Sequence, residues 1–230
     1  MKQIILLHGA IGAADQLAPL SLELEQKGYK VHSLNFSGHG KEPFATQFGI
    51  QQFAAEVFQY ILQHNLDQPD IFGYSMGGYV ALWLAREKPA LLGNVITLAT
   101  KFAWTPEAAV KESGMIVPEK LEEKVPHFAA ALQQRHGETW RELLARTREM
   151  MVQLGDEPLL AASSVAALGN RVLMGVGDSD TMVSLDETLA IRNSIPGSSL
   201  YVLPQTPHPI EKVPVALLAS LIAGFGSDTK

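Results

Sequence analysis

The chain has 230 residues, of which 47% are hydrophobic and 18% are charged, and it contains no cysteine. This composition allows one large domain with a sizeable core, and it excludes disulfides, thiolate nucleophiles and cysteine-based metal sites. The formal net charge of -6 and the lack of any Lys/Arg run argue against a nucleic-acid partner and against a basic patch for membrane surfaces. The first apolar run is too short for a secretory signal, and no run reaches the length of a membrane span. We therefore expect a soluble, cytoplasmic protein.

Six short apolar runs, rich in Val, Ile and Leu, predict buried strands. In chain order they are QIILLHG, KVHSLNF, DIFGYS, NVITLAT, RVLMGVGD and SLYVLP. Helical patterns lie between most of them: one is marked by Leu17, Leu20, Leu24 and Tyr29, one runs from Phe53 to Leu62, and one from Val80 to Arg86. This alternation predicts an α/β fold with an about six-stranded, mostly parallel sheet and helices on both faces.

The alternation breaks once, between Thr100 and Leu168, where only helical patterns occur. We predict an α/β core of residues 1–100 and 169–230 with a helical lid, residues 101–168, inserted in it. Such an insertion follows the carboxyl end of a strand, where open α/β folds bind ligands. Phe102 and Trp104 come directly after the fourth predicted strand, so we expect them to line an apolar substrate pocket.

The stretch FGYSMGGY places Ser75 between the glycines at 73 and 77, after a predicted strand and before a predicted helix. The Gly-x-Ser-x-Gly pattern alone is weak, because it arises often by chance, so its strand-and-helix context decides its meaning. At a tight strand-to-helix turn the serine is strained and its hydroxyl is raised above the sheet. Ser75 is the predicted nucleophile, and the Met76 N–H at the helix start is a predicted oxyanion donor.

A serine nucleophile needs a base, which a third group must orient. Of seven histidines, His208 alone follows the last predicted strand at its carboxyl end, above the sheet like Ser75, and it is the predicted base. His127 and His136 fall in the predicted lid, where we expect ordinary polar positions. The loop GVGDSD after the fifth strand offers Asp178 and Asp180 as candidate acids, with the other one capping the turn or the next helix.

These motifs together resemble the α/β-hydrolase superfamily, in particular its lid-bearing esterases and lipases. The residues that carry the resemblance are His8-Gly9, Gly38-His39-Gly40, Gly73 to Gly78, Gly177 to Asp180, and HPIEKVP from His208 to Pro214. The resemblance covers nearly the whole chain and is least in the predicted lid. It implies that the Ala10 N–H is a second oxyanion donor and that Asp180, rather than Asp178, is the acid.

The sequence departs from the family pattern at three points. It opens with the His-Gly strand, without the antiparallel pair that usually precedes it, which predicts a sheet of six parallel strands. Pro207 and Ser184 stand where the family often has a glycine and a proline, and neither change removes a catalytic group.

We expect neither a metal nor a cofactor. His8, His39 and Asp15 lack the spacing of a metal site, and each histidine lies in a turn motif. The segment HGAIGAAD has neither the dinucleotide-binding pattern nor the Lys-Ser/Thr of a nucleotide-triphosphate loop.

The leading hypothesis is a serine hydrolase that cleaves a small, mainly apolar ester or thioester through a Ser-His-Asp triad and an acyl-enzyme. One alternative is a carbon-carbon hydrolase or lyase with the same triad. A carboxylated substrate would then require a cation in the pocket, and we expect the lid arginines to face water instead: Arg135, Arg141, Arg146 and Arg148. Another alternative is a ligand-binding protein with vestigial turnover, because a fold does not determine a function.

Overall fold

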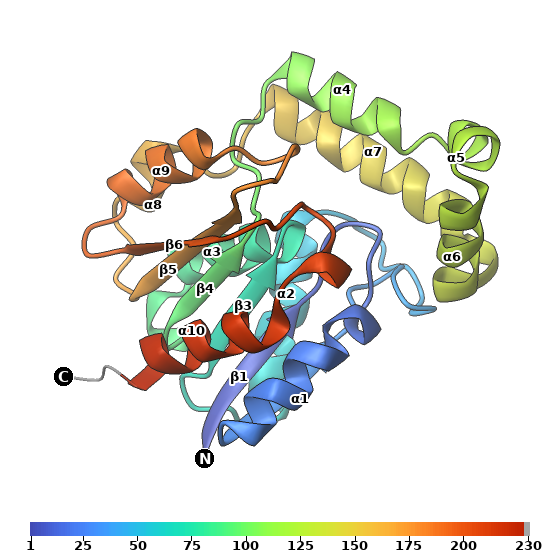
Figure 1. Ribbon diagram of the computed structural model, residues 1–230. Coiled ribbons are helices and arrows are strands. Elements are labelled where there is room, and N and C mark those ends of the chain that lie inside the picture. The colour runs from blue at the N-terminus through green and yellow to red at the C-terminus, as the bar shows by residue number, and fades with distance from the viewer. Residues whose placement is uncertain (228–230) are drawn as a thin grey trace.

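The computed structural model describes residues 1–227, in which six parallel strands form one sheet (Figure 1). They are β1 (Lys2–Leu7), β2 (Tyr29–Leu34), β3 (Asp70–Tyr74), β4 (Val95–Leu98), β5 (Val172–Gly177) and β6 (Ser199–Leu203). Their order across the sheet is β2-β1-β3-β4-β5-β6. The predicted fold class is confirmed, and all strand pairs are parallel. One detail is wrong: Tyr29 begins β2 instead of ending the first helix, because that helix already stops at Gln26.

Helices cover both faces of the sheet, because the strands are apolar on both sides. Alternate residues of each strand point to opposite faces. Ile4 and Leu6 pack with α1 (Ala18–Gln26) and α10 (Val215–Ser227), whereas Ile5 and Leu7 pack with the helices of the other face. The latter are α2 (Ile50–Gln63), α3 (Met76–Glu87), α8 (Ala162–Val165) and α9 (Leu185–Ser194). Short 3-10 helices occupy Ala14–Leu17, Pro89–Leu91, Gly137–Thr139 and Ile210–Lys212.

Four further helices lie between β4 and β5 in the sequence and above the carboxyl ends of the strands in space (Figure 1). They are α4 (Pro106–Met115), α5 (Pro118–Lys124), α6 (Pro126–His136) and α7 (Trp140–Asp156). Helix α4 packs along α7, and α5 packs on α6. A proline stands at the first position of α4, α5 and α6, where its missing N–H costs nothing. We call residues 106–156 the helical insertion. No helix within residues 1–227 is long and apolar enough to cross a membrane.

The order in which successive strands are added to the sheet changes direction at β1. From β1 the chain moves outward to β2 and then returns to place β3 on the other side of β1. Open α/β folds bind ligands in the crevice outside the carboxyl ends of the strands at such a switch point. The loops that follow β1 and β3, which carry residues 8–12 and Ser75, therefore meet where a ligand site is expected.

One histidine fastens the helical insertion to two loops of the sheet. His136, at the end of α6, is 1% exposed. Its Nε2 donates to Ile11 O at 2.8 Å, and its Nδ1 accepts from the Gly40 N–H at 3.0 Å. The expectation that His136 is an ordinary polar position is therefore wrong. Burial lowers the pKa of His136, which suits an imidazole that must accept a hydrogen bond through Nδ1.

His8 and His39 lie beneath His136, with ring centroids 4.9 Å apart from each other. His8 donates from Nδ1 to Gly9 O at 2.8 Å and accepts from the Phe36 N–H at Nε2, at 3.2 Å, so its neutral form is satisfied at both nitrogens. Burial lowers the pKa of His8 from 6.5 to about 4 and holds that of His39 well below its usual value. Among the described residues no group of three or more His, Asp or Glu side chains could hold a metal ion.

These buried histidines make the stability of the fold depend on pH. An unfolded histidine takes up a proton near pH 6.5, whereas folded His8 stays neutral down to a pH of about 4. Between these values the unfolded chain binds more protons, so the free energy of unfolding falls as the pH is lowered. We expect a loss on the order of 2 kcal/mol from His8 alone between about pH 7.5 and about pH 4.5. Urea unfolding across this range measures it.

His8→Asn, which removes this titrating group, should reduce the pH dependence by the contribution of His8, while buried His39 and His136 still contribute. A free energy of unfolding that stays constant over the range in the unmodified protein would contradict the prediction.

Candidate functional site

Ser75 occupies a strained turn between β3 and α3. Its backbone has φ 52° and ψ -116°, a conformation that residues other than glycine rarely adopt. Such a conformation costs on the order of 1–3 kcal/mol. The N–H of Ser75 donates to Leu98 O at 2.8 Å, and its carbonyl accepts from Thr100 Oγ1 at 3.2 Å. These bonds to the end of β4 hold the serine in its strained conformation.

The glycines around Ser75 are required by close backbone contacts. A Cβ atom at Gly73 would overlap the backbone of Gly77 and Gly78, and a Cβ at Gly77 would overlap the carbonyl of Leu7 and lie 2.7 Å from that of His8. No L side chain fits at either position without displacing the backbone. The turn can therefore be this tight, and this close to the end of β1, only with glycine at both places.

The loop after β1 lies directly against Ser75. A Cβ at Gly9 would lie 3.3 Å from the Cβ of Ser75 and 2.8 Å from the Tyr74 ring. Within the described residues, no hydrogen bond occupies the backbone N–H of Ala10 or that of Met76. Ala10 and Met76 line the same cavity as Ser75. The two predicted oxyanion donors are thus unengaged and near the serine.

His208 is held from two sides in the loop after β6. Its Nδ1 lies 2.8 Å from Asp180 Oδ2, and the Tyr74 hydroxyl donates to its carbonyl at 2.8 Å. With Nδ1 engaged by a carboxylate acceptor, Nδ1 carries the proton and Nε2 is left as the basic nitrogen. His208 and Ser75 line the same cavity, and no hydrogen bond joins their side chains in the described chain.

Asp180 is the carboxylate that meets the histidine. Its side chain is fully buried, and Oδ1 accepts from the N–H groups of Met182 at 2.8 Å and Val183 at 2.9 Å. Burial raises the pKa of Asp180, but the hydrogen bonds from His208 and these N–H groups outweigh it, and the net pKa is lower than usual. A carboxylate that stays ionised suits a partner for an imidazolium.

Asp178 has a different position. It is exposed, and its Oδ1 accepts from Ser179 Oγ at 2.9 Å and from the Thr206 N–H at 3.3 Å. It joins the loop that carries Asp180 to the loop that carries His208. Ser184, which stands where a proline is common, caps α9 by accepting from the Glu187 N–H at 3.1 Å.

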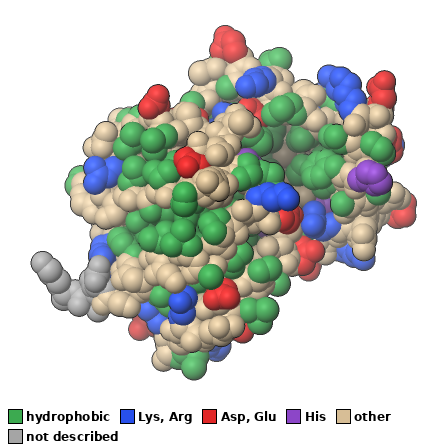
Figure 2. All heavy atoms as spheres, viewed as in Figure 1, with side chains coloured by type: hydrophobic (Ala, Val, Ile, Leu, Met, Phe, Trp, Pro, Cys, Tyr) green, Lys and Arg blue, Asp and Glu red, His purple; other side chains and the backbone are tan. Residues whose placement is uncertain are grey.

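Two cavities meet at Ser75. The narrow cavity, about 60 Å³, extends toward α3 and α7, and the wide cavity, about 350 Å³, extends under the helical insertion toward α5 and α6. Both are lined by Ala10, Ser75, Glu112, Met151, Met182 and His208. Figure 2 shows a hollow between the insertion and the sheet-bearing part of the molecule, with hydrophobic side chains gathered around it. Most of the surface available to a ligand is therefore apolar.

The structure separates the two residues that were expected to line a substrate pocket. Trp104 lines the narrow cavity. Phe102 is not among the residues that line either cavity; its buried ring stacks on Tyr79 with centroids 6.1 Å apart. The backbone reverses direction between the two residues, as the hydrogen bond from the Trp104 N–H to Phe102 O shows.

A family model described as the alpha/beta hydrolase fold matches residues 2–150. The chain belongs to this family. The residues matched include β1, the turn at Ser75, β4 and most of the helical insertion.

Relatives of this alpha/beta hydrolase include lipases and esterases. The chain is 26% identical over 171 residues to an sn-1-specific diacylglycerol lipase, ABHD11, of Xenopus laevis, which covers 74% of this chain and 49% of the relative. It is 32% identical over 119 residues to a pimeloyl-[acyl-carrier protein] methyl ester esterase of Neisseria meningitidis, 51% of this chain and 44% of the relative. The chain thus spans half or less of the length of these curated relatives.

Among solved structures, the 2-hydroxy-6-oxo-6-phenylhexa-2,4-dienoate hydrolase of Rhodococcus sp. strain RHA1 superposes with a TM-score of 0.80. The match covers 98% of this chain and 90% of that one at 17% sequence identity. At this identity the likeness concerns the fold.

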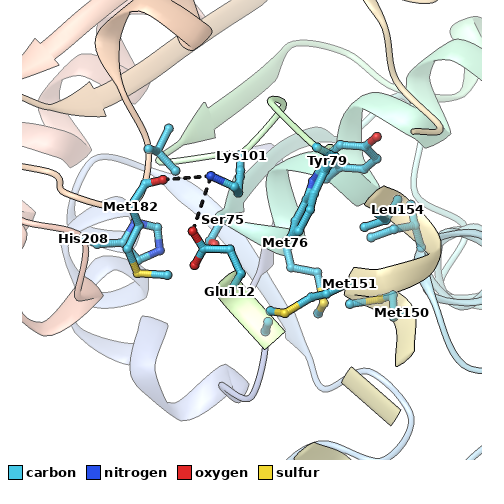
Figure 3. A pocket seen from close by; sticks show the side chains of 14 residues that line it. Ser75, Met76, Tyr79, Lys101, Glu112, Met150, Met151, Leu154, Met182 and His208 are labelled. Atoms are coloured by element: carbon cyan, nitrogen blue, oxygen red, sulfur yellow. Dashed lines mark hydrogen bonds and ion pairs between the residues drawn. The ribbon is translucent and has the colours of Figure 1, made fainter. Parts of the chain in front are cut away.

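Sequence reasoning missed two charged residues of this alpha/beta hydrolase that line the narrow cavity. Lys101 and Glu112 form an ion pair of 3.6 Å, and Glu112 is 4% exposed on α4 (Figure 3). Arg135, expected to face water, lines the wide cavity and pairs with Asp15 at 3.5 Å. A buried glutamate in an otherwise polar helix gives no signal in sequence, because periodicity does not show which turn of a helix faces a cavity.

The hydrogen bond between His208 and Asp180 generates a test of the two aspartates. We expect Asp180→Asn to lower kcat by at least about a thousandfold, because the amide stabilises neither the productive tautomer nor the charged imidazole. Asp178→Asn, the matched control, should lower kcat by less than about tenfold, since its partners are a serine and a backbone N–H. Steady-state kinetics on an ester hydrolysed by the unmodified protein measures both. The reverse ranking would give the role to Asp178.

Proposed function

We propose that the protein is a serine hydrolase that cleaves small, mainly apolar esters or thioesters through an acyl-enzyme. The observation that carries the proposal is the 2.8 Å hydrogen bond to buried Asp180 from His208, which lines the same cavity as strained Ser75. A histidine oriented by a carboxylate beside a serine is the arrangement that activates a hydroxyl nucleophile.

In the proposed reaction, Ser75 Oγ attacks the carbonyl carbon and its proton passes to His208 Nε2. The oxyanion that forms accepts hydrogen bonds from the N–H groups of Ala10 and Met76, at the positive end of α3. His208 then returns the proton to the leaving oxygen or sulfur, and the acyl group stays on Ser75. Water attacks this ester with His208 again as the base, which releases the acid and restores the serine. No metal or cofactor takes part in these steps.

The cavities support a mainly apolar substrate. Four methionines, Met76, Met150, Met151 and Met182, line the narrow cavity with Trp104. Thioether side chains are flexible and adapt to apolar groups of different shape. The wide cavity adds Met115, Ile116, Leu121 and Phe128 of the helical insertion. One cavity on each side of Ser75 suits the two parts of an ester, the acyl group and the leaving group.

The alternatives from the same fold are less well supported. A carbon-carbon hydrolase or lyase acting on a carboxylated substrate needs an unpaired cation in the cavity. Both the lysine and the arginine that line the cavities are paired with carboxylates, Lys101 with Glu112 and Arg135 with Asp15. A ligand-binding protein without turnover would not need a strained serine beside an oriented histidine.

The proposal predicts covalent labelling of one residue. A fluorophosphonate should transfer its phosphonyl group to the peptide that contains Ser75, with loss of fluoride, because an activated serine attacks phosphorus as it attacks a carbonyl carbon. Ser75→Ala should abolish the label and lower ester hydrolysis by several orders of magnitude, and adding His208→Ala should lower it little further, since the residues act as a unit. Mass spectrometry and a panel of p-nitrophenyl esters and acyl thioesters provide the readouts. A label that persists in Ser75→Ala would refute the assignment.

The narrow cavity predicts a preference for apolar groups of modest size. Along a series of straight-chain esters, kcat/KM should rise with chain length, because each buried CH₂ adds up to about 0.8 kcal/mol of transition-state binding. It should then fall when the cavity is full. Trp104→Ala should move the optimum to longer chains. Trp83→Ala removes the same side chain outside both cavities and should leave the optimum unchanged. A flat series in the unmodified protein would contradict the prediction.

A further inference from the structure

An ion pair between buried Glu112 and partly exposed Lys101 lies at the point where the two cavities meet. Lys101 comes shortly after β4, and its Nζ donates to Met182 O at 3.1 Å and lies 3.6 Å from Glu112 Oε1. Figure 3 shows Lys101 joined to Met182 and to Glu112, with the carboxyl group of Glu112 turned toward Lys101. Glu112 lines both cavities, and Lys101 lines the narrow one. The pair therefore faces whatever binds beside the serine.

The second carboxylate oxygen of Glu112 has no partner. Oε2 is buried and accepts no hydrogen bond within the described chain. A buried polar atom without a hydrogen bond loses its hydration without compensation, and this cost is greater for a charged group. Buried polar atoms in proteins are overwhelmingly paired, so an unpaired oxygen in a side chain that lines a cavity indicates an acceptor for a ligand.

Holding α4 in place does not account for this oxygen. The ion pair with Lys101 uses Oε1 alone. Helix α4 is held along α7 by close packing, since a Cβ at Gly155 of α7 would lie 2.5 Å from the Cβ of Ala109. The free Oε2 contributes to neither contact.

The charge of the site restricts the ligand group. Lys101 and Glu112 together are neutral, so an ammonium group would be repelled by the lysine and a carboxylate by the glutamate. A lysine ammonium has three N–H groups, of which Met182 O accepts one; the contact with Glu112 Oε1, at 3.6 Å, is an ion pair and leaves N–H groups for a ligand. The site thus offers one acceptor and one donor to a neutral group. A hydroxyl, which donates one proton and accepts through its lone pairs, matches both.

We propose that Glu112 Oε2 and Lys101 Nζ bind a free hydroxyl group of the substrate, and that the substrate class is an ester or thioester that carries a hydroxyl in the part that enters the narrow cavity. The inference rests on the proposed function for the scissile bond. It adds one polar requirement to an otherwise apolar site. A site built to pair a hydroxyl discriminates against an analogue without it, because the buried polar groups are then left unpaired.

Binding to the Ser75→Ala protein tests the proposal without turnover. NMR titration gives the Kd of 2-hydroxyethyl butyrate and of ethyl 3-hydroxybutyrate, which place the hydroxyl in the alcohol part or in the acyl part. The corresponding O-methyl ethers, which can accept but cannot donate, are the matched ligands. We expect one of the two hydroxy esters to bind at least about tenfold more tightly than its ether, as a hydrogen bond to a charged group implies.

Variants assign the preference to the ion pair. Glu112→Gln in the Ser75→Ala protein should reduce the ratio of the two Kd values to about threefold or less, whereas Glu107→Gln, an exposed glutamate of the same helix, should leave it unchanged. If Glu112→Gln fails to fold, Lys101→Met with Glu112→Leu replaces the whole pair by apolar side chains, a change that buried pairs tolerate. This double variant should also lose the preference. A purely structural role for Glu112 would alter stability and leave the ratio intact.

Equal affinities of each hydroxy ester and its ether, no measurable binding of either, or a ratio that survives Glu112→Gln would each overturn the proposal. Hydrolysis of the same esters by the protein with Ser75 intact is measured separately. Turnover without a hydroxyl preference removes this inference alone, and a hydroxyl preference without turnover removes the proposed function alone.

Discussion

The close approach of three backbone segments at Ser75 is the constraint on which the rest of the site depends. Glycines at 73 and 77 let the start of α3 press against β3 and against the carbonyls at the end of β1. This contact forces Ser75 into positive φ, and it also brings the loop after β1 next to the serine. One packing requirement thus sets the direction of the hydroxyl, the free N–H groups around it and the position of the cavity at the switch point of the sheet.

Much of the fold and of the candidate site was predictable from sequence, because both depend on local patterns and on parallel topology. Buried parallel strands are continuous apolar runs, and their carboxyl ends all meet at one edge of the sheet. Ser75, Asp180 and His208, which follow three different strands, were therefore expected at the same edge before any contact was known. The choice between Asp178 and Asp180 was not local. It came from the resemblance, and in the structure it is Asp180 whose carboxylate reaches His208.

What sequence could not give is the orientation of side chains within the helical insertion and its connection to β4. Phe102 and Trp104 are two positions apart, but a tight turn sends one ring into the core and the other to the cavity. His136 and Glu112 look like surface residues of polar helices, yet they are buried because α6 docks on two loops and α4 faces the serine. These outcomes depend on how the insertion packs on the sheet, which no periodicity encodes.

The methionines around Ser75 have a consequence for the protein under oxidative stress. Thioether sulfur is converted by mild oxidants to the sulfoxide, a polar and chiral group. Four methionines line the narrow cavity, and Met182 is 39% exposed, so oxidants reach this wall from solvent. Oxidation would place polar oxygen on surfaces that the proposed apolar substrate would contact. Oxidation of these methionines would therefore lower the affinity of the cavity for apolar ligands. Reductases that convert the sulfoxide back to methionine would restore that affinity.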